Sequence, residues 1–569
     1  MKYLLAAINA KYIHSSPAVW LLQDSVPQKY RSLVQIAEYT INEYPSEILA
    51  KIYREKPDVL AISCYIWNER TVDWLLPELA KILPETAIWL GGPEVCYNAE
   101  ETLRRYPAVT GVMTGEGEVS FPGIVEAYEK ETDPRQNLLM QVPGLLFRRT
   151  DGSFFRTPPA IVENLDALPF IYDNLAPFEN RILYYESSRG CPFSCAYCVS
   201  AREQGLRRKS LSVVEKQLQF FLNHNVPQVK FLDRSFNCGQ KRTLAIWSYL
   251  KEHDNGITNF HFELEPQLLT EPEVNLLTTL RPGQFQVEIG VQSTNEKTLE
   301  ALGRKGNYEK LTMDVSALLD AGNMHVHLDL IAGLPYEDYA SFRNSFNDVY
   351  RLHPHELQLG FLKILHGTPL EQDTARYGIR HLDKAPYEVL STNWLSYDDI
   401  IQLKQVEEVL EIYWNSGQFP TTMRMLETFF PDPFSMYEAL AEYYDQGGLF
   451  IQTPARIRRY VILLDFIRET IGKDHPDFAL FQELLTYDLY LRENMKSRPD
   501  FAPEPVYQKR QKDIHEEIFH YPVHRIRPFG IQSLPEDLQN QNEYRLCFDY
   551  AQRSQVTKNA LVTVKTIIL

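Results

Sequence analysis

Short apolar runs alternate with helical patterns along the first 135 or so residues of the chain. The apolar runs predict five strands, at 2–9, 32–41, 57–68, 86–95 and 108–118. Residues 46–56 and 68–83 have the apolar spacing of helices, and Ser46 is expected to cap the first of them. Strands buried on both faces and separated by helices are typical of a parallel, doubly wound sheet. We therefore expect an α/β first domain over residues 1–135.

Glycines and small polar residues follow these expected strands. A ligand on a doubly wound sheet binds beyond the carboxyl ends of the strands. The candidates at those ends are Asn9, Ala10, Ser63, Gly91, Gly92, Pro93, Gly115, Glu116 and Gly117. We expect them to line a binding edge, although glycines at strand ends are more often only turns.

A hairpin and a proline-rich segment come next, and we assign residues 136–180 to them. Asp151-Gly152 matches a type I′ turn between two short strands. Four prolines between 158 and 177 then indicate an inter-domain linker.

The alternation of strands and helices restarts at about residue 181. It predicts six strands, at 182–188, 228–235, 259–266, 284–293, 325–335 and 356–365, with helices such as 211–224 between them. Six β/α units are too few to close an eight-stranded barrel. We therefore expect a partial, TIM-like (β/α)6 barrel over residues 181–366.

Beyond the barrel the pattern changes to amphipathic helices with few strands. Residues 542–550 and 560–569 could be terminal strands. This predicts a mainly α-helical C-terminal domain over residues 367–569, and it contains no repeat and no catalytic motif.

Composition narrows the class of protein. With 569 residues, 44% of them apolar and 23% charged, the chain reads as a multidomain globular protein. No run approaches the about 18–20 apolar residues of a membrane span, and residues 1–16 read as a first strand rather than a secretory signal. We therefore expect a cytoplasmic protein.

The net charge of -17 makes nucleic acid an unlikely partner, because nonspecific binding to phosphates needs clustered cations. The basic and aromatic segment 507–529 is more readily explained as a solvated, partly packed face. The acidic balance favours a small molecule or a peptide as substrate.

Three of the seven cysteines lie within eight residues, as Cys191-x3-Cys195-x2-Cys198, after the first strand of the second array. This spacing lets one tight loop turn three thiolates towards a common centre, which suits zinc or an iron–sulfur cluster. A structural zinc needs a fourth ligand, and the next histidine and cysteine, His224 and Cys238, lie across a helix. Structural zinc and a chance grouping of core cysteines are the alternatives.

Three ligands on a four-iron cube would leave one iron open, which is useful in a catalyst. The C-x3-C-x2-C loop after the first strand of a six-fold β/α array resembles the radical S-adenosylmethionine (radical SAM) superfamily. The resemblance implies a [4Fe–4S] cluster held by the three cysteines, with S-adenosylmethionine on the open iron. It also implies reductive cleavage to a 5′-deoxyadenosyl radical, with electrons from an external flavodoxin or ferredoxin.

Polar residues alternate with apolar ones along two of the barrel strands. Val287 and Ile289 share one face of strand 284–293, so Glu288, Gly290 and Gln292 share the other. The candidate S-adenosylmethionine contacts are Glu265, Glu288, Gln292 and Ser293, the last three by resemblance to the family's E-x-G-x-Q-S strand. Segments 330–335 and 363–370 resemble the strands that cradle adenine. The alternative is that these polar residues only satisfy one another inside the barrel.

A Rossmann-like domain before such a barrel is similar to the cobalamin-binding class of the superfamily, as are segments 8–22, 90–96 and 113–121. The resemblance implies that the nine strand-end candidates contact cobalamin. The Asp-x-His-x-x-Gly motif, whose histidine ligates cobalt, is absent. The context of His14 differs, so the lower face of cobalt stays unassigned. A degenerate sheet that binds no cobalamin is the alternative.

These implications together favour an enzyme that methylates an unactivated carbon. Cyclisation, rearrangement or oxidation with the same cofactors is one alternative. A cluster- or cobalamin-binding sensor whose helical tail contacts a partner is another. The tail itself resembles an uncharacterised helical domain and implies no activity.

Overall fold

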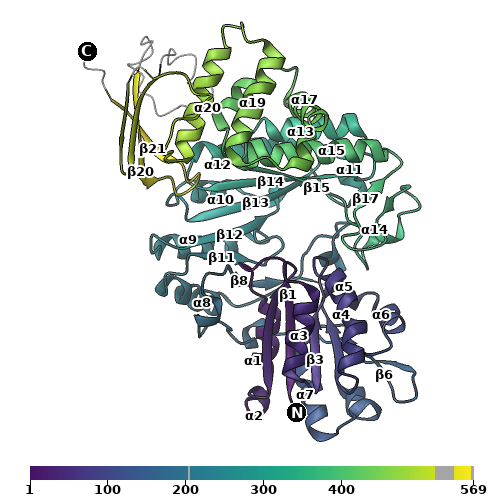
Figure 1. The fold of residues 1–569 in the computed structure, drawn as a ribbon. Coiled ribbons are helices and arrows are strands. Elements are labelled where there is room, and N and C mark those ends of the chain that lie inside the picture. The colour runs from purple at the N-terminus through teal and green to yellow at the C-terminus, as the bar shows by residue number, and fades with distance from the viewer. Residues whose placement is uncertain (203–204, 506, 520–543, 566–569) are drawn as a thin grey trace. The chain divides into compact units, whose positions relative to one another are not determined.

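The computed structural model describes residues 1–202, 205–505, 507–519 and 544–565 (Figure 1). The chain forms two compact units. The first contains Met1–Leu268, Glu300–Arg304 and Phe361–Thr392, and the second contains Leu269–Leu299, Lys305–Gly360 and Asn393–Leu569. Each unit is described by itself below.

The first unit begins with a seven-stranded sheet in the order β2-β1-β3-β4-β5-β6-β7. Its first five strands are parallel, and all five expected runs are confirmed. They are β1 (Tyr3–Asn9), β2 (Val34–Thr40), β3 (Val59–Ser63), β4 (Ala87–Gly91) and β5 (Val109–Met113). Every residue of β1 is buried, as a strand covered on both faces requires.

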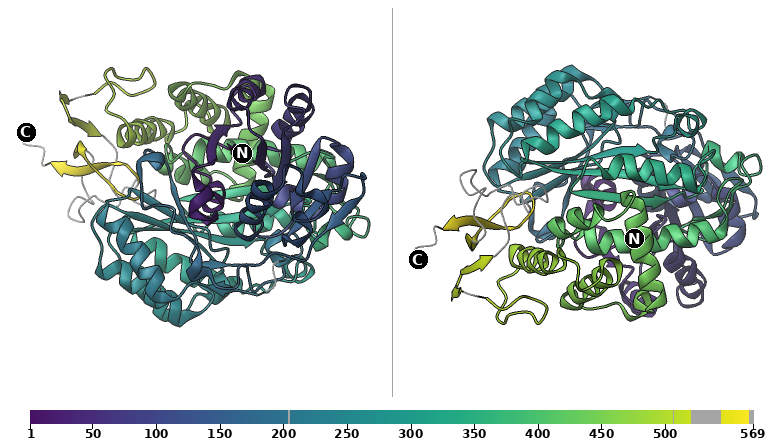
Figure 2. Two further views of the ribbon diagram at one scale, coloured as in Figure 1. Left: turned by 90° about the horizontal axis from the view of Figure 1, so that it is seen from below. Right: turned by 90° about the horizontal axis from the view of Figure 1, so that it is seen from above.

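Helices cover both faces of this sheet (Figure 1, Figure 2). They are α1 (Pro17–Ser25), α3 (Pro45–Glu55), α4 (Glu69–Ile82), α6 (Ala99–Arg105) and α7 (Gly117–Lys130). Leu4 and Ile8 of β1 share a core with α3, α4 and α6, whereas Tyr3 and Leu5 share the opposite core with α1 and α7. The expected N-cap Ser46 is wrong. Helix α3 begins at Pro45 after Tyr44, because a proline with its fixed φ suits the first helical position.

The expected hairpin is present as β6 (Leu145–Arg148) and β7 (Phe154–Arg156), which extend the first sheet beyond β5. The expected turn type is wrong. A type I′ turn needs positive φ at both central residues, but only Gly152 has it, at 85°. Gly152 N donates to Arg149 O at 3.0 Å, and Arg149 N donates to Ser153 O at 2.8 Å. This is the three-residue loop in which a glycine bulge follows the turn.

All six expected strands of the second array are confirmed. In the first unit β8 (Leu183–Tyr185), β11 (Gln228–Phe231) and β12 (Asn259–Leu264) are parallel neighbours, with α8 (Leu211–Asn223) and α9 (Gln240–Glu252) between them in sequence. In the second unit β13 (Phe285–Gln292) pairs in parallel with β14 (His325–Ala332). Helices α12 (Tyr308–Ala321) and α13 (Tyr339–Tyr350) and strand β15 (Glu356–Phe361) continue the alternation. The domain boundaries at 135, 180 and 366 stay predictions.

The C-terminal part is mainly helical, as expected. Its larger helices are α15 (Tyr397–Leu410), α16 (Pro420–Glu427), α17 (Pro433–Gln446), α19 (Arg456–Ile471) and α20 (Phe478–Arg492). A four-stranded antiparallel sheet follows, formed by β18 (Gln508–Gln511), β19 (Ile514–Phe519), β20 (Tyr544–Arg553) and β21 (Ala560–Lys565).

The two terminal strands are confirmed, and the described part of segment 507–529 fits the expected solvated, partly packed face, since residues 508–513 are largely exposed and residues 515–517 are buried. Residues 508–519 contain the hairpin β18–β19, in which His515 and Glu517 are buried. His515 Nε2 lies 3.0 Å from Glu517 Oε2, so the two polar groups satisfy each other. Residues 520–529 lie outside the described residues. Among the described helices, none combines the length and the apolar character needed to cross a bilayer.

Candidate cofactor-binding site

The loop with the three cysteines is fixed by backbone hydrogen bonds. Cys191 follows Gly190, whose φ of 92° turns the chain away from the short strand β9 (Ser188–Arg189). Cys198 N donates to Cys195 O at 3.0 Å, which closes a turn between these two cysteines. Ala196 donates to Leu302 O at 3.0 Å and accepts from Leu370 N at 2.9 Å. The loop is therefore held before any ligand binds.

Arg304, which the sequence did not single out, lies beside this loop. Arg304 Nη1 lies 3.7 Å from Cys195 Sγ, and Arg304 Nη2 donates to Glu265 Oε2 at 2.9 Å. Burial raises the pKa of Cys195, and the Arg304 guanidinium opposes that rise. Burial also raises the pKa of Cys238 to about 12, with a further contribution from Cys191.

Within the described part of the chain, no three His, Cys, Asp or Glu side chains gather where a single metal ion could sit. This holds for Cys191, Cys195 and Cys198 as well, so it does not distinguish zinc from an iron–sulfur cluster. All seven cysteines are free thiols. Three thiols on one tied loop, with a guanidinium nearby to stabilise thiolate, are a donor set that fits an iron–sulfur cluster. Their role as ligands stays a prediction.

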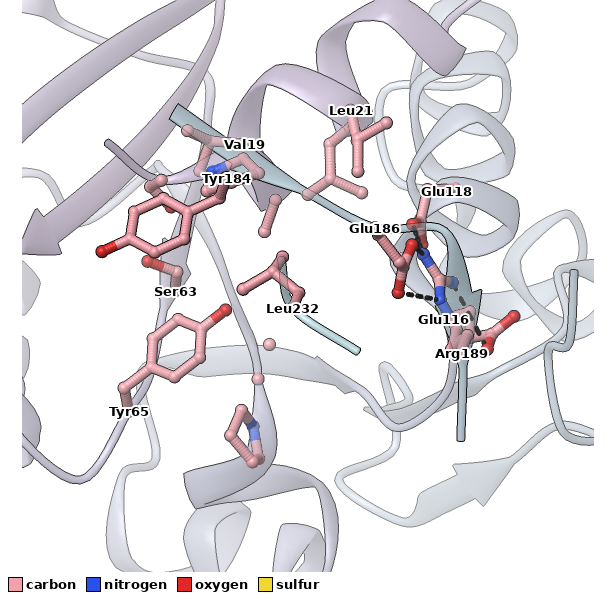
Figure 3. Close-up of a pocket in the computed structure, with 18 of the residues that line it drawn as sticks. Val19, Leu21, Ser63, Tyr65, Glu116, Glu118, Tyr184, Glu186, Arg189 and Leu232 are labelled. Carbon is pink, nitrogen blue, oxygen red and sulfur yellow. Dashed lines mark hydrogen bonds and ion pairs between the residues drawn. The ribbon is translucent and has the colours of Figure 1, made fainter. Parts of the chain in front are cut away.

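A cavity of about 730 Å³ lies in the first unit, at the carboxyl ends of its parallel strands (Figure 3). All nine strand-end candidates line it: Asn9, Ala10, Ser63, Gly91, Gly92, Pro93, Gly115, Glu116 and Gly117. Residues at the ends of β8 and β11 line it as well, among them Tyr184 and Leu232, and so does Gly190. The cavity therefore runs from the first sheet to the residue that precedes Cys191.

Two glycines at this edge are required by the packing of the protein itself. Gly92 has a φ of 108°, and a Cβ there would lie 2.4 Å from the carbonyl oxygen of Cys64. A Cβ on Gly115 would lie 2.8 Å from the carbonyl oxygen of Ala160. These glycines are required by close backbone approaches whether or not a ligand is bound, so their contact with a corrin stays a prediction.

The carboxylate of Glu116 forms hydrogen bonds and ion pairs within the protein. Arg207 donates to its carboxylate from Nη1 at 3.0 Å and from Nη2 at 2.5 Å, and Val162 N also donates to it. Arg189 Nη1 lies 3.3 Å away. Burial alone would raise the pKa of Glu116, but these donors lower it below its usual value. The carboxylate of Glu116 is therefore engaged by donors of the protein itself.

Arg189 forms ion pairs with three carboxylates at the wall of the cavity (Figure 3). Besides Glu116, it donates to Glu118 Oε1 at 2.8 Å and to Glu186 at 2.8 and 2.9 Å. Because Arg189 stands two residues before Cys191, this network ties the β5–α7 loop to the cysteine loop. Sequence reasoning missed Arg189, since nothing local marks its partners.

His14 also lines the cavity. Its Nδ1 lies 2.6 Å from Tyr184 Oη, and burial lowers the pKa of the imidazole. One ring nitrogen is thus engaged by the protein.

The second unit holds three of the four candidates for S-adenosylmethionine; the fourth, Glu265, lies in the first unit with Arg304. The expected alternation along β13 holds as far as Gly290, because Val287 and Ile289 are buried while Glu288 is only partly buried. Gln292, expected on the face of Glu288, is instead buried after a shift in strand register. Gln292 ends the strand with a φ of 69°. Ser293 Oγ donates to the buried Glu337 Oε1 at 2.6 Å. Ser293 thus satisfies a neighbour in this structure, and its contact with a cofactor stays a prediction.

Glu337, which the sequence did not single out, should make the folding stability of the protein depend on pH. Burial raises its pKa from 4.5 to about 7, so the folded protein retains a proton that the unfolded chain has lost between these values. Folding stability should therefore fall by roughly 3 kcal/mol as the pH rises from about 4.5 to 7. Denaturant unfolding of a Glu337→Gln variant over this range should lack that component. An unchanged pH dependence in the variant would contradict the assignment.

Comparisons with known proteins match three parts of the chain. A B12 binding domain matches residues 3–125, and the Radical SAM superfamily matches residues 185–349. A protein of unknown function, DUF4080, matches residues 375–564. The expected class of the first two parts is confirmed, and so is the uncharacterised nature of the third.

A cobalamin-dependent radical SAM methyltransferase, TokK of Streptomyces tokunonensis, is 28% identical over 368 residues. The match covers 58% of this chain and 51% of TokK, so the chain spans about half the length of that relative.

Two solved structures have a similar fold. The radical S-adenosylmethionine methyltransferase TsrM from Kitasatospora setae, with cobalamin and a [4Fe–4S] cluster bound, has a TM-score of 0.54 at 15% identity, over 68% of this chain and 79% of TsrM. The cobalamin-dependent radical enzyme OxsB, with aqua-cobalamin and S-adenosylmethionine bound, has a TM-score of 0.56 at 14% identity, over 85% of this chain and 78% of OxsB. At such identities the likeness shows the fold alone.

Proposed function

This chain joins a B12-binding domain to a radical SAM domain, and from that premise we propose that it is a cobalamin-dependent methyltransferase acting on an unactivated carbon. One observation carries the proposal. A single cavity is lined by all nine strand-end candidates of the first domain and by Gly190, the residue before Cys191. A corrin at the first sheet and a cluster at the cysteine loop would thus open onto the same space, as transfer between them requires.

Named residues have distinct tasks in this proposal. Cys191, Cys195 and Cys198 hold the cluster, and Arg304 stabilises the Cys195 thiolate from 3.7 Å. Glu265, Glu288, Gln292 and Ser293 contact S-adenosylmethionine. The nine strand-end residues line the corrin site. When bound, these groups supply the electron transfer, the radical and the methyl group, while the protein orients them and limits access of water and oxygen.

The proposal includes a reducing environment and an external electron donor. Seven free thiols fit the cytoplasm, where disulfides are rare. A one-electron protein donor of flavodoxin or ferredoxin type would reduce the cluster, and the substrate would be a small molecule or a peptide.

Anaerobic purification provides the direct test. We expect about four irons per chain, as a four-iron cube requires, together with the visible absorbance of a corrin. With S-adenosylmethionine carrying a labelled methyl group, the label should enter the product. A protein with iron but no corrin after reconstitution would overturn the cobalamin part, and turnover without label in the product would overturn methyl transfer.

A further inference from the structure

Every carboxylate on the wall of the cavity is paired with a cationic side chain. Four acidic residues line it, and each has a basic partner within the first unit. The pairs are Glu116, Glu118 and Glu186 with Arg189, and Glu263 with Lys230. Each of these carboxylates therefore has a cation within 4.0 Å.

The cations of the wall are mostly engaged as well. Lys209 is buried, donates to Gln217 Oε1 at 3.2 Å and lies over the ring of Tyr185. Burial lowers the pKa of His14, which favours its neutral form. Arg234 differs from the others, because among the described residues its guanidinium has no hydrogen bond and no ion pair. Among the described residues, Arg234 is thus the cation of the wall whose donors are free for a ligand.

The chain at Arg234 is held in place by the neighbouring Asp233. Its neighbour Asp233 is 2% exposed and accepts hydrogen bonds from Ser187 N at 2.9 Å and from Ser188 Oγ at 2.5 Å. Leu232, on the other side of Asp233, projects into the cavity although it is apolar (Figure 3). Leu232 and Arg234 thus line the cavity from either side of an anchored residue.

Arg234 also lies between the two cofactor regions of the proposed function. The next residue, Ser235, places its Oγ 3.7 Å from Cys191 Sγ. On the other side, burial raises the pKa of Tyr65, and the charge of Arg234 opposes that rise. Tyr65 follows β3 of the first domain and points into the cavity (Figure 3). A substrate that reached both regions would pass this guanidinium.

We propose that Arg234 binds a carboxylate of the substrate, an inference that rests on the proposed function. A guanidinium forms paired hydrogen bonds with a carboxylate, and the exposed Arg234 has its donors available for one. Arg234 contributes one positive charge, which matches the single negative charge of a carboxylate more closely than the double charge of a phosphate. Leu232, Tyr65 and Tyr184 provide apolar and aromatic surface for the attached carbon skeleton. The substrate class is therefore a carboxylic acid with an apolar body.

Binding of matched probes tests this inference. Cobalamin-loaded protein is titrated calorimetrically with octanoate, octanamide and octyl phosphate. Octanoate should bind the unmodified protein about tenfold to a hundredfold more tightly than octanamide, as expected for a charged hydrogen bond. Arg234→Gln should bind the two equally. Arg104→Gln removes an exposed arginine of α6 and should leave the preference intact.

Three results would overturn the inference. Octanamide could bind the unmodified protein as tightly as octanoate, or octyl phosphate could bind more tightly than octanoate through Arg234. Arg234→Gln could also lose the corrin, which would assign Arg234 to the cofactor. Corrin absorbance and 5′-deoxyadenosine formation are measured on the same samples. A failure of the proposed function is then seen in the unmodified protein as absent corrin or absent cleavage, separately from the probe affinities.

Discussion

Cys195→Ala protein will form almost no 5′-deoxyadenosine from S-adenosylmethionine under anaerobic reducing conditions. The fall should exceed about a hundredfold, because even loss of an outer partner of a metal ligand costs about 10–100-fold. Cys195 is buried beside Arg304, and alanine would remove the sulfur that we propose as a ligand of the cluster. Quantitative mass spectrometry of 5′-deoxyadenosine and an iron assay measure the effect.

The matched control is Cys547→Ala. Cys547 is also a buried free thiol, but it lies in β20 of the C-terminal sheet. Its removal should leave iron content and cleavage close to those of the unmodified protein. Cleavage that persists in Cys195→Ala, or is lost equally in both variants, would count against the cysteine assignment.

Replacing Arg189 with methionine should have the largest effect on stability. The side chain of Arg189 is 13% exposed, and its loss leaves Glu118 and Glu186 without a cationic partner and Glu116 with Arg207 alone. Breaking a buried ion pair by removing one partner costs about 3–5 kcal/mol. Chemical unfolding should show that loss in the first unit, and gel filtration should show weaker retention of the corrin.

Arg104→Gln serves as the control for Arg189→Met, because Arg104 forms an exposed pair with Glu100. Such pairs contribute about 0–1 kcal/mol. Arg189→Lys should recover part of the stability, since it restores the charge but not the paired geometry. A loss below about 1 kcal/mol in Arg189→Met would contradict a stabilising role for this network.

The periodic parts of the fold could be predicted from the sequence. Strand β1 is apolar along its length and is buried on both faces, and β13 alternates as its sequence does as far as Gly290. The predictions that were wrong concern the start of a helix and the type of a turn, where neighbouring residues favour different local structures. A proline outweighed Ser46 at the start of α3, and Asp151-Gly152 adopted a bulged loop because only Gly152 takes positive φ.

The candidate site could be predicted only where topology brings residues together. The ends of parallel strands meet at one edge, so the nine strand-end residues were expected to be neighbours, and they line one cavity. Arg189, Arg234, Arg304 and Glu337 could not be recognised in this way. Their functions depend on what surrounds them in space, as with Arg189 and Glu118, which are 71 residues apart. No local pattern encodes such a pair.

The contacts of Arg189 bear on how this protein can be dissected experimentally. A truncated form starting near residue 181 would lack Glu116 and Glu118 and would leave Arg189 with only Glu186. That arginine stands two positions from the first cysteine, so a fragment made to simplify iron reconstitution would disturb the loop it was meant to isolate. Spectroscopy that tests for the proposed cluster is therefore best carried out on chains that include Glu116 and Glu118.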